Sequence, residues 1–274
     1  MIYEVMEIMG RRAEIWRSMK LINKATSKGK IKLSKKVTVN LTKSIENTIS
    51  NSVVGLLDGV ISKEEVVIDS KKEAVDIKIA SVNQIGVKIG EVPTIIIPIP
   101  KKKAEEAFNC LDDGIVGTLL TTSTLLPIYK KMKKAWLDSN DETSPLTSIM
   151  YLPNICVFID SVRNDYAKYY QMINVLFVGI PSKSVLEKNN DDEILNPEDY
   201  YARMIADIMD SAIKCGCDNL IFDPYAGKLA NDLTGVSAIW KQILTSQRVI
   251  DHVNTVTLTL KSDSEFIIAK NNIL

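Results

Sequence analysis

The sequence predicts an α/β fold, a three-layer α/β/α sandwich with a mixed central sheet. The stretch from Tyr201 to Trp240 reads as helix, buried strand, small-residue loop and helix, which is half of a nucleotide-binding fold. The second half of the chain alternates strands and helices with short gaps, which favours an open sheet over a barrel. With 274 residues, 46% of them hydrophobic and 25% charged, the chain can bury a sizeable core.

Within this stretch, apolar residues from Met204 to Ile213 recur at helical spacing and the pair of cysteines around Gly216 ends the helix. The short apolar run 219–222 suits a buried parallel strand. The loop 223–232 follows at the carboxyl end of that strand, and an amphipathic helix is predicted over 236–244. Open α/β sheets bind their ligands in the crevice outside such strand ends.

Taken in order, the first hundred residues combine two helices with several short strands. Helices are predicted over 2–21 and over 44–57, the second opened by Ser44, with a polar, basic loop over 23–36 between them. Strands are predicted over 37–40, 66–68, 75–82 and 94–99. The alternating run 75–82 indicates a half-exposed or edge strand. The apolar run 94–99 indicates a central strand whose end is set by Pro98 and Pro100, because proline cannot donate to a ladder.

The remaining elements are expected from similar patterns. The segment 101–109 is charged and helix-prone, 114–126 is an apolar segment ended by Pro127, 129–136 is a lysine-rich turn of helix, and 138–145 is a loop. Strands are predicted over 151–160, 173–180 and 255–260, an acidic loop over 187–199 with Pro197 in the first turn of the next helix, and a closing helix over 263–270. We expect one domain over residues 1–274, with insertions around 60–80 and 104–145.

Composition narrows the partners and the compartment. Lys and Arg number 34 and Asp and Glu also number 34, so the whole chain has no net field and nucleic acid is an unfavourable partner. Protein partners or a homo-oligomer are expected instead. The amino terminus lacks a signal-peptide apolar region, and no segment approaches the roughly 20 apolar residues that span a bilayer. A cytoplasmic protein is expected. Heavy use of Lys, Ile and Asn indicates an AT-rich genome, bacterial, viral or phage.

Cysteine and histidine usage argues against a metal or a cofactor. The four cysteines form no CxxC pair, and one histidine, His252, stands beside them in the whole chain. The expected state of the thiols is reduced and buried, and no metal or cofactor is predicted. There is no GxSxG motif for His252 to serve, no GxxxxGK[ST] and no GxGxxG. The tyrosines of the segment YAKYY (166–170) could stack on a base or serve an interface.

From Tyr151 onward, the order of features resembles the bacterial-type poly(ADP-ribose) glycohydrolase family, whose fold is a macro domain. The strand-like runs YLPNICVFID and VLFVGIPS match its paired strands, Arg203 and the stretch Ala212 to Gly216 match its next helix, and the segments DPYAGKLANDL and GVSAIWKQIL follow in the family's order. In the first half, RAEIWRSMKLINKATS and GTLLTTSTLLP resemble two of its helices.

The resemblance implies where a site should lie. The family binds ADP-ribose on a Gly-Gly-Gly loop and cleaves it with a Gln-Glu-Glu motif, whose second glutamate protonates the leaving ribose oxygen. Here the strand IIIPIP continues into Lys101-Lys102-Lys103 without a glycine triplet, and Ala104-Glu105-Glu106 stands where Gln-Glu-Glu would. The implied catalytic candidates are Glu105 and Glu106, and the implied ligand-binding residues are Asp223, Tyr225, Ala226, Gly227, Lys228 and Asn231.

Two functional hypotheses follow. In the first, a macro-like domain, such as one of a virus or phage, has lost glycohydrolase catalysis and acts as a binding or structural protein, because a framework can outlast its site. In the second, the chain is an ADP-ribose reader or an ADP-ribose-processing enzyme that uses Glu106, Gly227 and Asn231 in a divergent pocket. The loop after Pro100 discriminates between them: a pocket open to a diphosphate favours the second, and side chains that fill it favour the first.

Overall fold

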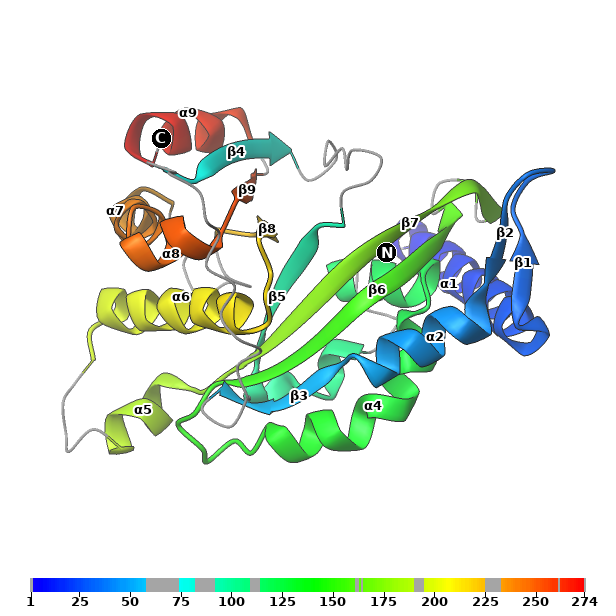
Figure 1. Ribbon diagram of the computed structural model, residues 1–274, viewed down its shortest axis with the longest axis horizontal. Coiled ribbons are helices and arrows are strands. Elements are labelled where there is room, and N and C mark those ends of the chain that lie inside the picture. Colours follow the sequence, from blue (N-terminus) through cyan, green and yellow to red (C-terminus); the bar gives the residue numbers. More distant parts are fainter. Residues whose placement is uncertain are drawn as a thin grey trace. The chain divides into compact units, whose positions relative to one another are not determined.

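The computed structural model describes residues 2–57, 74–81, 92–108, 114–160, 163, 165–189, 195–224, 233–260 and 262–273 (Figure 1). By its contacts the chain divides into two compact units. Unit 1 comprises residues 1–52, 103–137 and 152–173, and unit 2 comprises 53–102, 138–151 and 174–274. The chain therefore passes between the units several times, and each unit is assembled from segments that are distant in sequence.

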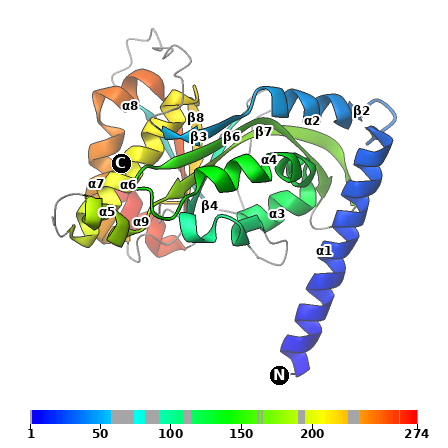
Figure 2. The same ribbon diagram turned by 90° about the horizontal axis from the view of Figure 1, so that it is seen from below.

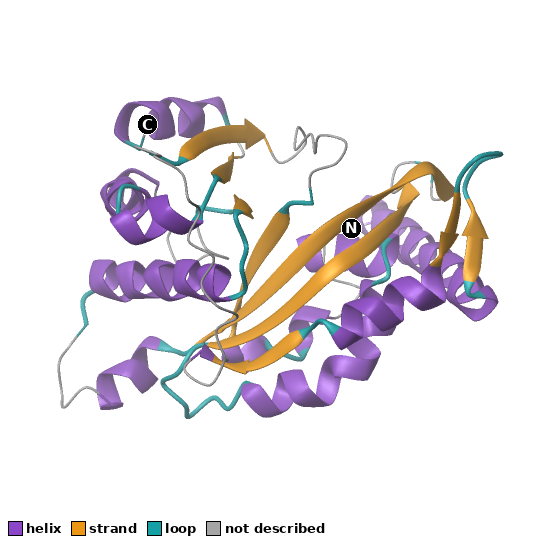
Figure 3. Cartoon of the chain, in the orientation of Figure 1, coloured by secondary structure: helices purple, strands orange, loops and turns teal. Residues whose placement is uncertain are grey.

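Unit 1 is mainly helical, with a two-stranded antiparallel ribbon (Figure 3). Its elements are α1 (Ile2–Lys28), β1 (Lys30–Lys32), β2 (Thr38–Asn40), α2 (Leu41–Ser50), the 3₁₀ turn η4 (Glu106–Phe108), α3 (Ile115–Thr122) and most of α4 (Leu125–Ser139). Part of its core consists of Ile22 and Ala25 of α1, Ile31 and Val39 of the ribbon, and Phe158. The side chain of Asn40 caps α2 by accepting a hydrogen bond from the backbone N–H of Lys43.

Unit 2 holds most of a seven-stranded mixed sheet, in the order β3-β6-β7-β5-β8-β9-β4 among the described residues. The strands are β3 (Val53–Leu56), β4 (Asp76–Ser81), β5 (Thr94–Pro100), β6 (Ser148–Asp160), β7 (Asp165–Ile180), β8 (Asn219–Phe222) and β9 (Thr255–Leu260); β6 and β7 also contribute residues to unit 1. Strands β7, β5, β8, β9 and β4 pair in parallel, and β3 pairs antiparallel with β6.

Helices of unit 2 bury their apolar stripes on this sheet. The 3₁₀ turn η3 (Lys101–Lys103) follows β5, and the helices are α5 (Lys183–Asn189), α6 (Pro197–Lys214), α7 (Leu233–Leu244), α8 (Gln247–His252) and α9 (Asp263–Asn272). Residues at helical spacing along α6, from Tyr201 to Ile213, pack with Phe222, Trp240 and Leu258 in one continuous core. Among the described residues, no helix is long and apolar enough to cross a membrane.

These observations confirm the predicted α/β sandwich with a mixed central sheet. Strands 219–222 and 255–260 have the predicted bounds, β5 is an inner strand, and β4 lies at the edge of the sheet as its alternating pattern predicts. Pro197 lies in the first turn of α6, capped by Asn196. The predicted strand 66–68 lies outside the described residues. One domain with insertions around 60–80 and 104–145 stays a prediction.

Several predicted bounds are wrong, each for a physical reason. Helix α1 continues to Lys28, so the first part of the predicted loop 23–36 is helical. Helix α2 ends at Ser50 instead of near 57, because residues 53–56 pair with β6. Pro127 does not end a segment but lies in the first turn of α4, where a missing N–H costs no hydrogen bond. Residues 101–103 and 106–108 form two 3₁₀ turns within the segment 101–109, which the sequence marks as helix-prone.

Candidate functional site

The carboxyl ends of β5 and β8 form an offset edge in unit 2. The parallel register pairs Thr94 with Leu220, and β8 ends at Phe222 while β5 runs on to Pro100. The backbone N–H of Asn174 in β7 donates to the carbonyl of Pro93. The backbone groups of β5 alternate in direction, so those of residues 94, 96, 98 and 100 point toward β8. Pro98 and Pro100 thus lie beyond the end of β8, where their missing N–H groups remove no ladder bond. Such an edge is where open α/β sheets place ligands.

Lys101 stands directly after β5, and its side chain is buried. Its ammonium Nζ donates to the backbone carbonyls of Asp141 (3.2 Å) and Ser144 (3.3 Å), and the residue is 4% exposed. Burial lowers the pKa of Lys101, and the nearby charge of Asp141 opposes that shift. This ammonium holds the loop 138–145 and is already engaged by two carbonyls. The first lysine of the KKK run therefore acts as a structural anchor for that loop.

A buried polar cluster lies next to this anchor in the sheet. The hydroxyl of Ser148 donates to Oδ1 of Asn140 at 2.7 Å, and both side chains are buried. Gly179 pairs with Ile99 of β5, and a Cβ at this glycine would come within 2.0 Å of Asn140 Oδ1 and 2.1 Å of Ser148 Oγ. The glycine thus allows a polar cluster to pack against the last residues of β5.

The end of β8 is fixed by two aromatic side chains, which we call the aromatic clamp: Tyr201 of α6 and Trp240 of α7. The Tyr201 hydroxyl donates to the carbonyl of Pro224, and Trp240 Nε1 donates to the same carbonyl (3.1 Å) and to the Tyr201 oxygen (2.7 Å). The Trp240 ring also meets Phe222 edge to face, with centroids 4.9 Å apart. The first residues of the loop after β8 are therefore held by buried, satisfied polar groups.

In unit 1, the turn that carries Glu105 and Glu106 is held by one stripe of helix α4. Tyr129, Lys133 and Trp136 lie at positions i, i+4 and i+7 and share a face of the helix. Tyr129 stacks on Phe108 with centroids 3.7 Å apart, and Trp136 Nε1 donates to the carbonyl of Ala104 at 3.1 Å. Lys133 Nζ lies 2.6 Å from Oε1 of Glu105.

This arrangement holds Glu105 at the surface. Its side chain is 66% exposed, and its carboxylate is paired with Lys133. The pKa of the neighbouring Tyr129 is raised to about 12, first by burial and second by the charge of Glu105. Glu106 is exposed at the start of η4. Neither glutamate is buried, and burial is one of the ways in which a carboxyl group becomes a general acid near neutral pH.

The other candidate residues are only partly placed. Asp223 follows β8 directly and is half-buried. Tyr225, Ala226, Gly227, Lys228 and Asn231 lie outside the described residues. Glu105 and Glu106 belong to unit 1 and Asp223 to unit 2. One shared site stays a prediction.

Sequence reasoning missed the aromatic clamp, Lys101 and the α4 stripe. Their partners are backbone carbonyls or residues far away in sequence, and such contacts cannot be predicted from a local sequence pattern. His252, one of the candidates weighed for catalysis, lies in α8, where its Nδ1 hydrogen-bonds with the carbonyl of Arg248 at 2.7 Å.

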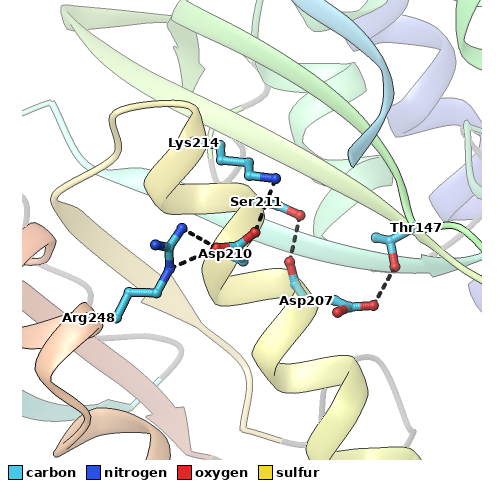
Figure 4. A network of polar contacts seen from close by, with 6 residues as sticks. All are labelled: Thr147, Asp207, Asp210, Ser211, Lys214 and Arg248. Atoms are coloured by element: carbon cyan, nitrogen blue, oxygen red, sulfur yellow. Dashed lines mark hydrogen bonds and ion pairs between the residues drawn. The ribbon is translucent and has the colours of Figure 1, made fainter. Parts of the chain in front are cut away.

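A hollow of unit 2, about 600 Å³, lies against α6, α7 and α8. Three of its charged lining residues, Asp207, Asp210 and Arg248, are engaged in contacts (Figure 4). Asp210 pairs with Arg248 of α8 and with Lys214 (3.4 Å), and Asp207 accepts a hydrogen bond from Thr147 (2.8 Å). These contacts tie α6 to its neighbours and give the hollow a structural explanation.

Fold, strand order and the placement of the strand-end edge define a macro-like α/β domain, similar to bacterial poly(ADP-ribose) glycohydrolases. No family model matches the sequence, and no curated protein matches it. Among solved structures, poly(ADP-ribose) glycohydrolase from Thermomonospora curvata is similar at a TM-score of 0.68 and 12% identity, over 96% of this chain and 99% of that chain.

Two further solved structures are similar to this chain with ligands bound. The Thermomonospora curvata enzyme bound to the inhibitor ADP-HPD is similar at a TM-score of 0.65 and 12% identity, over 96% of this chain and 99% of that chain. The Deinococcus radiodurans enzyme in complex with ADP-ribose is similar at a TM-score of 0.57 and 10% identity, over 84% of this chain and 98% of that chain. At these identities the likeness shows the fold.

Proposed function

We propose that this chain is a macro-like domain that binds an ADP-ribose-type nucleotide and has lost glycohydrolase catalysis. The observation that carries the proposal is the exposure of both candidate acids: Glu106 is exposed at the start of η4, and Glu105 is 66% exposed and paired with Lys133 at 2.6 Å. A catalytic acid that protonates a ribose oxygen must hold its proton near neutral pH, which requires burial or a neighbouring negative charge. Neither glutamate is buried, and the charge in contact with Glu105 is the positive charge of Lys133.

Binding is supported by the fold and by the strand-end edge of unit 2. Solved structures of similar fold hold ADP-ribose or ADP-HPD. The aromatic clamp fixes the start of the loop after β8 through the carbonyl of Pro224, which would pre-organise that loop for a ligand. Gly227 in this loop is the residue at which a diphosphate could approach the backbone most closely.

The alternative is an ADP-ribosyl glycohydrolase with a divergent site. It is favoured by the position of Glu105 and Glu106 in the segment that directly follows β5, since catalytic groups of open α/β sheets follow strand ends. Glu106 would be its acid, because no ion pair of Glu106 is found within the described residues.

Calorimetric titration with ADP-ribose, combined with a hydrolysis assay on poly(ADP-ribose), separates the alternatives. We expect micromolar binding that Gly227→Glu abolishes and Glu105→Gln leaves intact, with no release of ADP-ribose by any variant. Hydrolysis that is lost in Glu106→Gln and kept in Glu105→Gln would establish the enzyme instead. An absence of heat at millimolar ligand would contradict both and leave a protein-interaction role.

A further inference from the structure

The balanced charge of the whole chain hides a division between its units. Unit 1 contains 18 Lys and Arg against 10 Asp and Glu, a net charge of +8, and unit 2 contains 16 against 24, a net charge of −8. A field of one sign over a single unit attracts ligands of the opposite sign even when the whole chain is neutral. The two units therefore attract partners of opposite charge.

The positive charge of unit 1 is concentrated in one stretch. Residues 15–45 contain nine Lys and Arg and no Asp or Glu. This stretch runs through the second half of α1, the β1–β2 ribbon and the first turn of α2. A run of charged residues usually forms only a solvated face. It can bind a ligand when the fold brings several of its side chains to one surface.

They do converge on one side of the ribbon. Ile31 and Val39 are paired across the ribbon and buried, so Lys30 and Lys32 share its opposite, exposed face with their partners Asn40 and Thr38. Lys28 from α1, Lys30 from β1 and Lys43 from α2 line one hollow of about 760 Å³, together with Gly29, Asn40, Thr42 and Glu46. Three elements thus bring three ammonium groups to one concave surface.

Exposed aromatic rings accompany these cations in unit 1. Trp16 is 66% exposed, and Lys20, one turn further along α1, places its ammonium 5.2 Å from the Trp16 ring centroid. Tyr169 and Tyr170 are 74% and 43% exposed on β7, and as successive residues of a strand they point to opposite faces. The Tyr166 hydroxyl at the start of that strand contacts the carbonyl of Leu21 at 3.4 Å, and both views show this end of β7 beside α1 (Figures 1 and 2).

We infer that this basic surface, defined by Lys28, Lys30, Lys32 and Lys43, binds single-stranded nucleic acid, and that the bound strand extends to the exposed rings of unit 1: Trp16 on α1 and one of the two tyrosines on β7. Ammonium groups on a concave surface suit a phosphate backbone, and exposed aromatic rings suit unstacked bases; the combination is typical of binding to single strands. An acidic protein surface would use the lysines but would leave the exposed rings without a role. The inference is independent of the nucleotide pocket proposed above.

Fluorescence anisotropy with a labelled oligothymidine tests this inference on the full-length chain. We expect the triple variant Lys30→Glu, Lys32→Glu, Lys43→Glu to weaken binding at least about a hundred-fold at low salt and to reduce the salt slope by about 2, since each neutralised phosphate of a single strand contributes about 0.7. The matched control reverses three exposed lysines of unit 2, Lys188→Glu, Lys241→Glu and Lys270→Glu, and should bind like the wild type.

A second pair of variants separates stacking from charge. Tyr169→Ala with Tyr170→Ala should weaken binding at least about five-fold, whereas the two Phe substitutions should retain it, because base stacking needs the ring and not the hydroxyl. Equal loss in both lysine triples would overturn the inference, as would absence of binding by the wild type at low salt. Salt-sensitive self-association that requires Lys30, Lys32 and Lys43 would assign the surface to the acidic unit of a second copy instead.

Discussion

At the scale of single residues, Lys101 shows that a charge from a run of three lysines in the sequence is held inside the structure. Its ammonium donates to two carbonyls of the loop 138–145. Replacing Lys101 by Met, which keeps the length of the side chain, should lower the free energy of unfolding by about 1–3 kcal/mol near neutral pH, because two charge-assisted hydrogen bonds are lost. Urea denaturation followed by tryptophan fluorescence measures this. The exposed neighbour, in Lys102→Met, should change stability by less than about 0.5 kcal/mol.

The lowered pKa of Lys101 fixes the sign of the pH dependence. The folded chain releases this proton at a pH where the unfolded chain, with an ordinary pKa of 10.5, still holds it. The unfolded state therefore binds more protons in the window below 10.5, and the stability of the wild type gains a positive slope with pH there. Lys101→Met lacks this contribution, so the stability difference should widen as pH rises toward 10.5. A difference that narrows would contradict the buried ammonium.

At the scale of elements, local sequence patterns predicted the bounds of strands and helices that are determined by local interactions. The short apolar run of β8 and the β-branched run of β9 have the predicted bounds, since a buried parallel strand leaves little choice of environment. The predicted helix 44–57 failed because Ile45, Ile49 and Val53 continue a spacing of four, while pairing of 53–56 with β6, about a hundred residues away, takes those residues into the sheet. A partner so distant cannot be read from a window of the sequence.

The aromatic clamp shows how two helices set the end of a strand. Tyr201→Phe should destabilise the chain by about 1 kcal/mol, because the buried carbonyl of Pro224 loses a hydrogen bond. Trp240→Phe should destabilise it by about 1–3 kcal/mol, because it removes a buried donor and the smaller ring leaves a cavity. Both side chains share the carbonyl of Pro224 and contact each other, so the double variant should show a coupling energy above about 0.5 kcal/mol.

Tyr200→Phe provides the control for this double-mutant cycle. The Tyr200 hydroxyl also donates to a proline carbonyl, but to that of Pro181 (3.0 Å) and not to that of Pro224, where the two clamp side chains meet. Its combination with Trp240→Phe should therefore be additive in urea denaturation. Equal coupling in both cycles would mean that the clamp is not a local device.

At the scale of the whole molecule, the fold was more predictable than the candidate site. Strand and helix periodicity and the order of motifs point to a macro-like sandwich, which solved structures of similar fold support. The prediction that the chain has no charge field rested on the net charge of the whole chain, which is zero. The fold divides that charge between the units, whose net charges are +8 and −8. That sorting depends on three separate stretches entering unit 1, and only the tertiary structure provides it. The loop with Gly227 lies outside the described residues, so its role stays a prediction.

The two units should also differ in their resistance to opening. The ribbon of unit 1 has three residue pairs, whereas β5 of unit 2 is paired on both sides in a large continuous core. Opening free energy rises with the buried apolar surface that is exposed, so ribbon amides at Ile31 and Val39 should be at least about a hundred-fold less protected than those of Ile96 and Ile97, which corresponds to about 2.7 kcal/mol. Hydrogen exchange read by mass spectrometry over these segments measures the difference. Equal protection would show that both units open only in one global transition, and added oligothymidine should raise protection of the ribbon alone if the basic surface binds it.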